Sequence, residues 1–347
     1  MLKSLRISNY RAFHKLGIDE LSRINLISGR NNSGKTTLLE ALLLLSAGHP
    51  EITMHTAIIR GMKSERLPPA AIPSIYWRQM FKSFDFRTPI EISAKHESGG
   101  SLSMTVEMER DEIVKTSLTA SNEVLLGEEL QDPKLLATIR SDDEDWQRRI
   151  QVTDKEIHME RRHRPVLFPA WIVPSGLGDL RSDAECLDAL KKQKQAHRVV
   201  DALRIVDPSL TSLEVISQTG SPMIWADMGL SELVPLPTVG EGMVRVSRLA
   251  MCMVLARGGV LLVDEIENGI HHSIAADIWR FILDVVRELD VQVFATTHSY
   301  ECVQAAQSLH SDDLMLHRLE ASEEGHRCFS YHREHIDTAV RHSLEVR

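Results

Sequence analysis

The sequence predicts an α/β fold built on a mixed sheet, and three apolar segments that end in polar residues indicate it. Residues 24–28, 260–263 and 291–297 each have the composition of a short buried strand. Polar or charged residues follow each segment directly. Because ligands bind at the carboxyl ends of strands in open α/β sheets, we expect these three segments to converge on one site.

The first segment is followed by residues 29–36, Gly-Arg-Asn-Asn-Ser-Gly-Lys-Thr, which fit the phosphate-binding pattern G-x-x-x-x-G-K-[ST]. A strong helix-forming run over 37–45 comes next, so the pattern lies between a strand and a helix, as it requires. The two glycines let successive N–H groups face one anion, and the helix N-terminus adds positive charge there. We expect the nucleotide to be bound by Gly29, Arg30, Asn31, Asn32, Ser33, Gly34, Lys35, Thr36 and Thr37.

The catalytic roles follow from the same three strand ends. We expect Lys35 to reach the β- and γ-phosphates of ATP, and Thr36 to offer its hydroxyl to Mg²⁺. Asp264 is placed to hold the Mg²⁺ and its water, whereas Glu265, which points elsewhere, can polarise the attacking water. His298, at the end of the third strand, is expected to hydrogen-bond the γ-phosphate or that water.

Two strands precede the phosphate loop, over residues 5–13 and 18–27, and the first ends in an aromatic and basic corner. This corner suggests that a nucleotide base and ribose rest against Tyr10, Arg11 or Phe13. The alternative, which the sequence supports equally, places Tyr10 and Phe13 in the core and Arg11 on the surface.

A second anion site is predicted by Gly240-Glu241-Gly242, which opens a helix expected over residues 243–256. The first N–H groups of such a helix are free to bind an anion. Because one chain has no need of two γ-phosphate sites, we expect this loop to serve the nucleotide of a partner chain.

The middle of the chain predicts a separate lobe. Alternating residues on either side of a Gly-Gly turn predict a β-hairpin, an amphipathic pattern predicts one long helix, and a segment rich in both signs of charge is expected to be solvated. The predicted elements are hairpin strands over 89–95 and 101–108, a third strand near 113–118, the charged segment 141–164, an edge strand over 166–173, the helix 183–205, and strands over 213–216 and 223–226.

Composition restricts the partners and the compartment. The 347 residues carry a net charge of −9, so any nucleic-acid site must be a local patch rather than a basic surface. The four cysteines include no C-x-x-C pair, which favours a reducing compartment. The chain opens without a signal-peptide pattern, and its longest apolar run is too short to span a bilayer. We therefore expect a cytoplasmic protein with no membrane partner.

This set of motifs resembles the ABC-type ATPases, in the soluble branch that contains the SMC, RecF and OLD proteins. The resemblance is close over residues 1–48 and 236–310. In chain order, its motifs are the opening of SMC and RecF heads (9–13), the Walker A motif (29–36), the signature loop (240–242), Walker B with its catalytic glutamate (260–265), the D-loop of OLD-like proteins (267–273), and the switch histidine, His298.

The resemblance implies a P-loop NTPase fold of the ABC type, with an N-terminal antiparallel β subdomain and an inserted α+β lobe. The ATPase core would comprise residues 1–48 and 225–347, and the inserted lobe residues 49–224. It also implies a head-to-tail homodimer that clamps each ATP between the Walker A motif of one chain and the signature loop of the other. Hydrolysis would open the clamp.

Several departures from the family pattern shape the expected role. Gly240 stands where many ABC ATPases carry serine, and Gln79 is the candidate for the Q-loop glutamine. No segment is long enough for a coiled-coil arm, and residues 309–347 show no acidic nuclease cluster. These features are typical of a stand-alone OLD-like ATPase without a Toprim nuclease domain.

The function predicted from the sequence is an ATP-driven conformational switch that controls a separate effector, for example a nuclease in antiviral defence or DNA maintenance. A RecF-like ATP-dependent clamp on DNA in repair is the alternative. A transporter ATPase subunit is disfavoured by the D-loop and the β-rich lobe. Binding of ATP without turnover would show as the absence of phosphate release.

Overall fold

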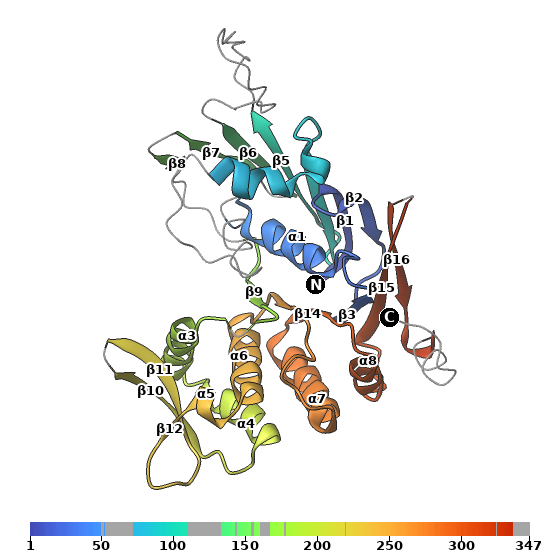
Figure 1. The fold of residues 1–347 in the computed structure, drawn as a ribbon. Coiled ribbons are helices and arrows are strands. Elements are labelled where there is room, and N and C mark those ends of the chain that lie inside the picture. The colour runs from blue at the N-terminus through green and yellow to red at the C-terminus, as the bar shows by residue number, and fades with distance from the viewer. Residues whose placement is uncertain are drawn as a thin grey trace, which may run out of the picture.

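A computed structural model of the chain describes residues 1–49, 52, 72–109, 133–142, 144–153, 156–159, 167–176, 178–218, 220–323 and 325–335. Figure 1 shows two large sheets with helix α1 (Lys35–Ala47) between them, and a layer of helices on the opposite face of the lower sheet. The strand predicted near 113–118 lies outside the described residues.

The lower sheet is mixed and carries the three predicted strands side by side. Its order is β16-β15-β3-β14-β13-β9, in which all the strands are parallel except β16, which pairs antiparallel with β15. Their bounds are β3 Ile24–Gly29, β9 Ala170–Val173, β13 Val260–Val263, β14 Gln292–Thr296, β15 Leu314–Ser322 and β16 Gly325–Tyr331. The edge strand expected over 166–173 is confirmed, and it lies beside β13.

This sheet is covered on both faces, which explains why its strands are continuous apolar runs rather than alternating ones. Val260 and Leu262 of β13 pack into one hydrophobic core, with α1 and the upper sheet. Leu261 and Val263 pack into a second core, with the helices of the opposite face. The successive side chains of one strand therefore join two separate cores.

The upper sheet is antiparallel and has the order β2-β1-β4-β5-β6-β7-β8. The predicted hairpin is confirmed, because β4 and β5 pair antiparallel with Ile90 opposite Val106. The described part of the segment 141–164 contributes β7 and β8. Most of these side chains are exposed or partly exposed, as expected of a solvated segment, whereas Ile150 and Val152 are buried on one face of the sheet. The strand bounds are β1 Leu2–Tyr10, β2 Phe13–Ile18, β4 Ile90–His96, β5 Ser101–Glu109, β6 Lys134–Ser141, β7 Asp145–Val152 and β8 Ile157–Met159.

The remaining elements lie on the other face of the lower sheet, apart from three short helical turns that follow residue 72 (Figure 1). The strands predicted over 213–216 and 223–226 are confirmed as β10 and β11. The bounds are α3 Leu180–Lys192, α4 Ala196–Val206, α5 Leu236–Val239, α6 Glu241–Leu255, α7 His272–Leu289, α8 Tyr300–Gln307, β10 Ser212–Gln218, β11 Ser221–Asp227, β12 Val234–Pro235, η2 Pro73–Trp77, η3 Arg78–Met80 and η4 Lys82–Phe84.

The single helix predicted over 183–205 is wrong, because the chain forms two helices, α3 and α4. Lys194 between them has a φ of 58°, in the left-handed region that ends a right-handed helix. The N–H of Gln195 then donates to the carbonyl of Leu190 at 2.8 Å. The apolar spacing continues through the break, and this is why the sequence pattern reads as one helix.

The mixed-sheet α/β fold class is confirmed. The division into a core of 1–48 and 225–347 and a lobe of 49–224 stays a prediction, and the sheets cross its boundaries. β4 to β8 extend the sheet that β1 and β2 begin, and β9 belongs to the lower sheet. Among the described residues, no helix has the length and apolarity needed to cross a membrane.

Candidate active site

A cavity of about 740 Å³ lies where the carboxyl ends of β3 and β13 meet the N-terminus of α1. Asp264 and Glu265 line it together with most of the predicted nucleotide residues, which are Arg11, Asn31, Asn32, Gly34, Lys35, Thr36 and Thr37. Arg30 and Ser33, from the same loop, instead line a smaller cavity of about 350 Å³ beside β15. The structure therefore brings the Walker A and Walker B residues to one place.

The two glycines of the phosphate loop are required by their surroundings. Gly34 caps α1 with a φ of 95°, and a Cβ there would lie 2.6 Å from the ring of Phe13. A Cβ on Gly29 would lie 2.5 Å from the carbonyl oxygen of Leu319. Any larger residue at these positions would force the loop away from the strands that hold it.

The side chain of Lys35 lies inside the phosphate loop and bonds to its main chain. Its Nζ donates hydrogen bonds of 2.7 Å to the carbonyl of Gly29 and 3.0 Å to that of Arg30. Burial lowers the pKa of Lys35, while the nearby carboxylates of Asp264, Glu265 and Glu267 raise it. The ammonium group is thus held within the loop, where the predicted phosphates would lie.

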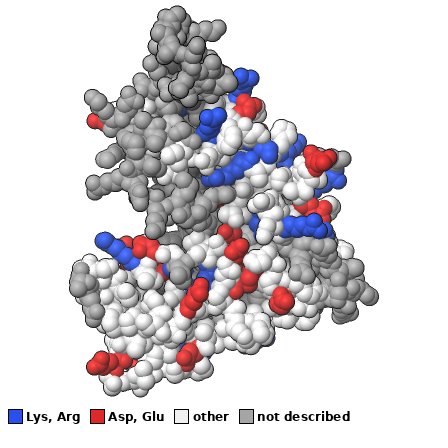
Figure 2. Space-filling view, in the orientation of Figure 1, with Lys and Arg blue, Asp and Glu red and all other residues white. Residues whose placement is uncertain are grey.

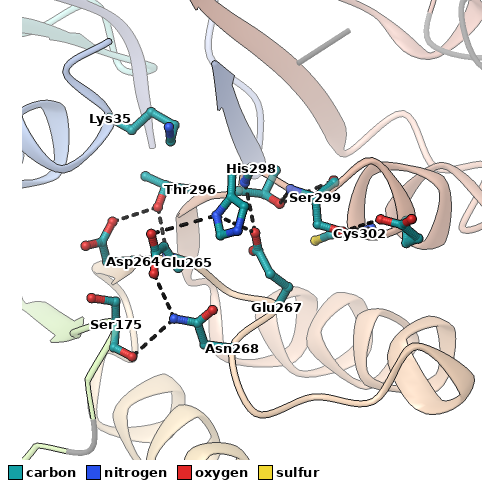
Figure 3. Close-up of polar contacts among 12 residues, drawn as sticks. Lys35, Ser175, Asp264, Glu265, Glu267, Asn268, Thr296, His298, Ser299 and Cys302 are labelled. Carbon is teal, nitrogen blue, oxygen red and sulfur yellow. Dashed lines mark hydrogen bonds and ion pairs between the residues drawn. The ribbon is translucent and has the colours of Figure 1, made fainter. Parts of the chain in front are cut away.

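Thr36 and Asp264 face one another across the cavity and are joined to β14 by Thr296. The hydroxyl of Thr36 lies 3.1 Å from Oδ1 and 3.2 Å from Oδ2 of Asp264. Thr296 donates to Oδ1 of Asp264 at 2.7 Å, as Figure 3 shows. Burial raises the pKa of Asp264, and the hydrogen bonds from Thr296 and Thr36 oppose that rise.

The oxygen atoms of Thr36 and Asp264 fit Mg²⁺, a hard cation that prefers oxygen ligands and takes only one or two carboxylates from a protein. In the described parts of the chain, no group of three or more His, Cys, Asp or Glu side chains could hold a metal. A cation here would thus need the remaining ligands from phosphate oxygens and water. This donor set suits a metal–nucleotide complex rather than a resident metal ion.

Glu265 is held by its backbone and its side chain in an unusual position. Its φ is 47°, in the left-handed region that residues other than glycine rarely adopt. Its N–H donates to the hydroxyl of Thr296 at 2.8 Å, and its Oε2 accepts from Asn268 at 2.8 Å. Asn268 also donates to the carbonyl of Ser175 at 3.3 Å (Figure 3). The other carboxylate oxygen remains directed toward His298.

His298 lies beside Glu265 but does not line the 740 Å³ cavity. Its Nδ1 is 3.7 Å from Glu265 Oε1 and 3.2 Å from Glu267 Oε1, and the main-chain N–H of His298 donates to Glu267 Oε1 at 2.8 Å. Figure 3 shows the imidazole between the two carboxylates. Glu267, which the sequence placed only within the D-loop, is therefore the residue that orients His298.

Arg245 of α6 is a second residue that the sequence did not identify. Its guanidinium is buried and donates to three main-chain carbonyls, those of Pro174, Asp264 and Glu265, the last two at 2.6 and 3.0 Å. Burial lowers the pKa of Arg245 to about 10, so the group is charged at neutral pH. It connects the helix that follows the predicted signature loop to the carboxylates of the site.

The predicted signature loop lies near this edge of the sheet but outside the cavity. The helix expected over 243–256 begins slightly earlier, since α6 starts at Glu241, with Gly240 at its N-cap. A Cβ on Gly242 would lie 2.6 Å from the carbonyl oxygen of Gly269, so this glycine packs directly on the D-loop. None of Gly240, Glu241 and Gly242 lines the cavity that contains Lys35.

Of the two alternatives for the N-terminal corner, the structure supports the core position for the aromatic residues. Tyr10 and Phe13 are both 0% exposed. Arg11 is not a surface residue, because its Nε lies 3.1 Å from Oε2 of the buried Glu40 and the residue lines the cavity. Gln79, the candidate for the Q-loop glutamine, also lines the cavity.

Together, the fold and this site define the head of an ABC-type ATPase of the SMC and RecF branch. Residues 24–303 match the family model described as "AAA domain, putative AbiEii toxin, Type IV TA system". The chain belongs to that family.

Two curated relatives and two solved structures place the chain further. It is 22% identical over 333 residues to the Helicobacter pylori protein named "ATP/GTP phosphatase", a match that covers 88% of this chain and 87% of that one. RecF of Idiomarina loihiensis is 43% identical over 47 residues, which are 14% of this chain and 13% of RecF.

An SMC head bound to the C-terminal winged-helix domain of ScpA has a TM-score of 0.51 at 12% identity, covering 98% of this chain and 99% of that one. A Pyrococcus furiosus SMC head with an extended coiled coil, bound to the C-terminal domain of ScpA, has a TM-score of 0.50 at 11% identity and covers 99% of each chain. These two structures show a shared fold.

Proposed function

We propose that this protein binds and hydrolyses ATP and uses the cycle as a conformational switch. One observation carries the proposal. Lys35, Thr36, Asp264 and Glu265 line a single cavity, with the Thr36 hydroxyl 3.1 Å from the Asp264 carboxylate. The relative named "ATP/GTP phosphatase", which is similar over most of its length, supports hydrolysis rather than binding alone.

In the proposed reaction, the N–H groups of the phosphate loop and the ammonium of Lys35 hold the β- and γ-phosphates. Thr36 and Asp264 would hold Mg²⁺, which neutralises charge on the phosphate oxygens. Glu265 accepts a proton from water as that water attacks the γ-phosphorus, and the bond to the β–γ bridging oxygen breaks to release ADP and phosphate. His298, oriented by Glu267, donates a hydrogen bond to the γ-phosphate or to the attacking water.

The second part of the proposal is a head-to-tail homodimer with ATP at its seam. It is supported by the position of Gly240, Glu241 and Gly242, at a helix N-terminus that does not line the cavity of its own chain. The distribution of charge also supports it. Figure 2 draws one face of the molecule. Basic side chains lie mainly over the upper part of that face, and acidic side chains lie mainly over its middle and lower parts. A head-to-tail arrangement would place opposite charges together.

The third part is a separate effector protein. Opening and closing of the dimer would control this effector in a cytoplasmic defence or DNA-maintenance system. The family description, which names a toxin of a Type IV TA system, supports a defence role. The solved SMC heads bound to ScpA support the idea that a head of this fold can hold a separate protein.

Two variants test the proposal. Lys35→Ala removes the phosphate contact, so ATP binding should be lost. Glu265→Gln keeps the shape of the site but removes the base, so it should bind ATP, release little phosphate and accumulate as a dimer. Nucleotide titration measures binding, phosphate release measures hydrolysis, and light scattering measures dimer formation. Hydrolysis by Glu265→Gln at the wild-type rate would contradict the assignment of Glu265 as the base.

A RecF-like DNA clamp is the second candidate, and the local similarity to RecF over 47 residues favours it. The net charge of −9 leaves little basic surface for the phosphate backbone. This candidate requires that ATP induce DNA binding whose affinity falls steeply as salt is raised. Titration of fluorescent duplexes with and without ATP, at two salt concentrations, tests it.

A further inference from the structure

A short segment, residues 78–84, forms part of the wall of the cavity. It contributes Gln79, Phe81, Ser83 and Phe84 to the lining. Hydrogen bonds fix it to the corner between β1 and β2, because the N–H of Arg11 donates to Met80 at 2.7 Å and Lys82 Nζ donates to Ala12 at 3.0 Å. These hydrogen bonds therefore hold the segment in place in the wall of the cavity.

Phe84 is unusual among the aromatic residues of this region. Its side chain is 54% exposed although it lines the cavity, whereas Phe81 in the same segment is 2% exposed and packs in the core. Ser83 and Phe84 have φ values of 52° and 61°, two consecutive residues in a region that L-amino acids avoid. This strained backbone turns the Phe84 ring away from the core.

The Phe84 ring contacts the side chain of Arg78. The guanidinium carbon of Arg78 lies 5.5 Å from the ring centroid, within the range of a cation–π contact. This contact positions the ring without burying it.

The cavity has room for more than a chain of phosphates. Its volume of about 740 Å³ falls within the range of pockets that take a whole small-molecule ligand. The aromatic residues of the N-terminal corner cannot contact the base of such a ligand, because Tyr10 and Phe13 are fully buried. Arg11 lines the cavity and its main-chain N–H is bonded to Met80, so a base that lies along Arg11 would lie beside the segment that carries Phe84.

We propose that Phe84 is the stacking platform for the nucleobase of the bound nucleotide. The inference rests on the proposed function, since it adds a base subsite to the same cavity. Every base has a π face, so stacking on a ring tolerates different bases. Adenine and guanine are both expected to be accepted.

The test compares nucleotides with inorganic tripolyphosphate, which has the phosphates but no base. Calorimetric titration is done with ATP, GTP and tripolyphosphate on the wild-type protein and on the variants Phe84→Ala and Phe84→Trp. Stacking on an aromatic ring contributes about 1–3 kcal/mol, so Phe84→Ala should weaken ATP and GTP by about 5- to 150-fold. Its affinity for tripolyphosphate should not change, and Phe84→Trp should restore nucleotide binding.

A matched control is Phe329→Ala, which removes another exposed ring, 41% accessible, from β16. It should leave all three affinities unchanged. The proposal is contradicted if Phe84→Ala binds ATP as tightly as the wild type does. It is also contradicted if the substitution weakens the affinity for tripolyphosphate by the same factor as the affinity for ATP. If the wild-type protein binds neither nucleotide nor tripolyphosphate, the proposed function fails, and the platform fails with it.

Discussion

The guanidinium of Arg245 lies 3.0 Å from the main-chain carbonyl of Glu265, and it also donates to the carbonyl of Asp264 at 2.6 Å. A single buried side chain of α6, the helix that begins directly after Gly240, thus holds the backbone of both carboxylates. Glu265 has a φ of 47°, so its backbone depends on such contacts to keep its position. Movement of α6 would move the carboxylate expected to activate water.

The first prediction concerns this link. Arg245→Gln should lower the rate of ATP hydrolysis by about 100-fold, because a small displacement of a catalytic group has an effect of that size. ATP affinity should be unchanged, since Arg245 does not line the cavity. Single-turnover hydrolysis and nucleotide titration, both below the melting temperature of the variant, separate the two effects. The control, Arg280→Gln, removes an arginine that is exposed on α7. Equal losses of rate and affinity would show that Arg245 only supports the fold.

The second prediction concerns the ion pair between α3 and α6. Arg248 donates to Asp183 at 2.8 Å, and the two side chains are 6% and 8% exposed. Burial raises the pKa of Asp183 although the guanidinium opposes the rise, which indicates a large desolvation cost. Asp183→Ala would leave a buried, unpaired guanidinium and should lower the free energy of unfolding by about 3–5 kcal/mol.

Glu185 on the same helix provides the control. Its pair with Arg181 is exposed on both sides, at 66% and 62%, so Glu185→Ala should cost less than about 1 kcal/mol. Chemical denaturation of the two variants gives the comparison. Similar losses for both would contradict the view that burial makes the Asp183 pair important.

The third prediction concerns acid stability. His317 of β15 is 0% exposed and bonds to Asn25 at 3.1 Å and to Ser330 at 2.9 Å, and burial lowers its pKa to about 3 from 6.5. Below pH 6.5 the unfolded chain binds a proton at this position, but the folded chain does not until pH 3. The contribution of His317 to the free energy of unfolding is thus fully present above pH 6.5, and it is lost progressively as the pH falls from 6.5 to 3.

The expected loss between pH 7 and pH 5 is about 2 kcal/mol from this residue. Denaturant midpoints measured across this range for the wild type and His317→Asn test the prediction, because the variant should lack that part of the pH dependence. His14→Asn, which changes an exposed histidine on β2, should keep it. A variant at position 317 with the full wild-type slope would assign the acid sensitivity to other groups.

Local patterns were enough to predict the phosphate loop, the strand that ends in Asp264 and the helix after Gly240. These features depend on residues adjacent in the chain, and their spacing is set by strand and helix geometry. The same rule predicted the hairpin of β4 and β5, but not that its sheet continues from β1. Strand order depends on contacts between residues far apart in the chain, which periodicity does not encode.

The residues that hold the site together could not be predicted for the same reason. Thr296, Glu267 and Arg245 reach Asp264, His298 and Glu265 from other elements of the fold. A threonine in a strand or an arginine in a helix is ordinary by composition. For Arg245, one signal was present: a charged residue within a largely apolar helix needs a buried partner.

The central claim is that each nucleotide is shared between two chains, and mixing two inactive variants tests it directly. Lys35→Ala removes the phosphate loop contact. Gly240→Asp adds a carboxylate at the N-cap of α6. A new Cβ there meets nothing within 4 Å, but residues with a side chain rarely adopt the φ of 159° at this position, so the variant must be shown to be folded before it is mixed.

In a head-to-tail dimer of the two variants, one site carries both changes and the other carries neither. An equimolar mixture should therefore recover about one quarter of the wild-type ATPase rate, because half of the dimers are mixed and each has one intact site. Circular dichroism of each variant confirms that it is folded before mixing. If the mixture remains as inactive as its two components, the nucleotide is not shared between chains and the account is contradicted.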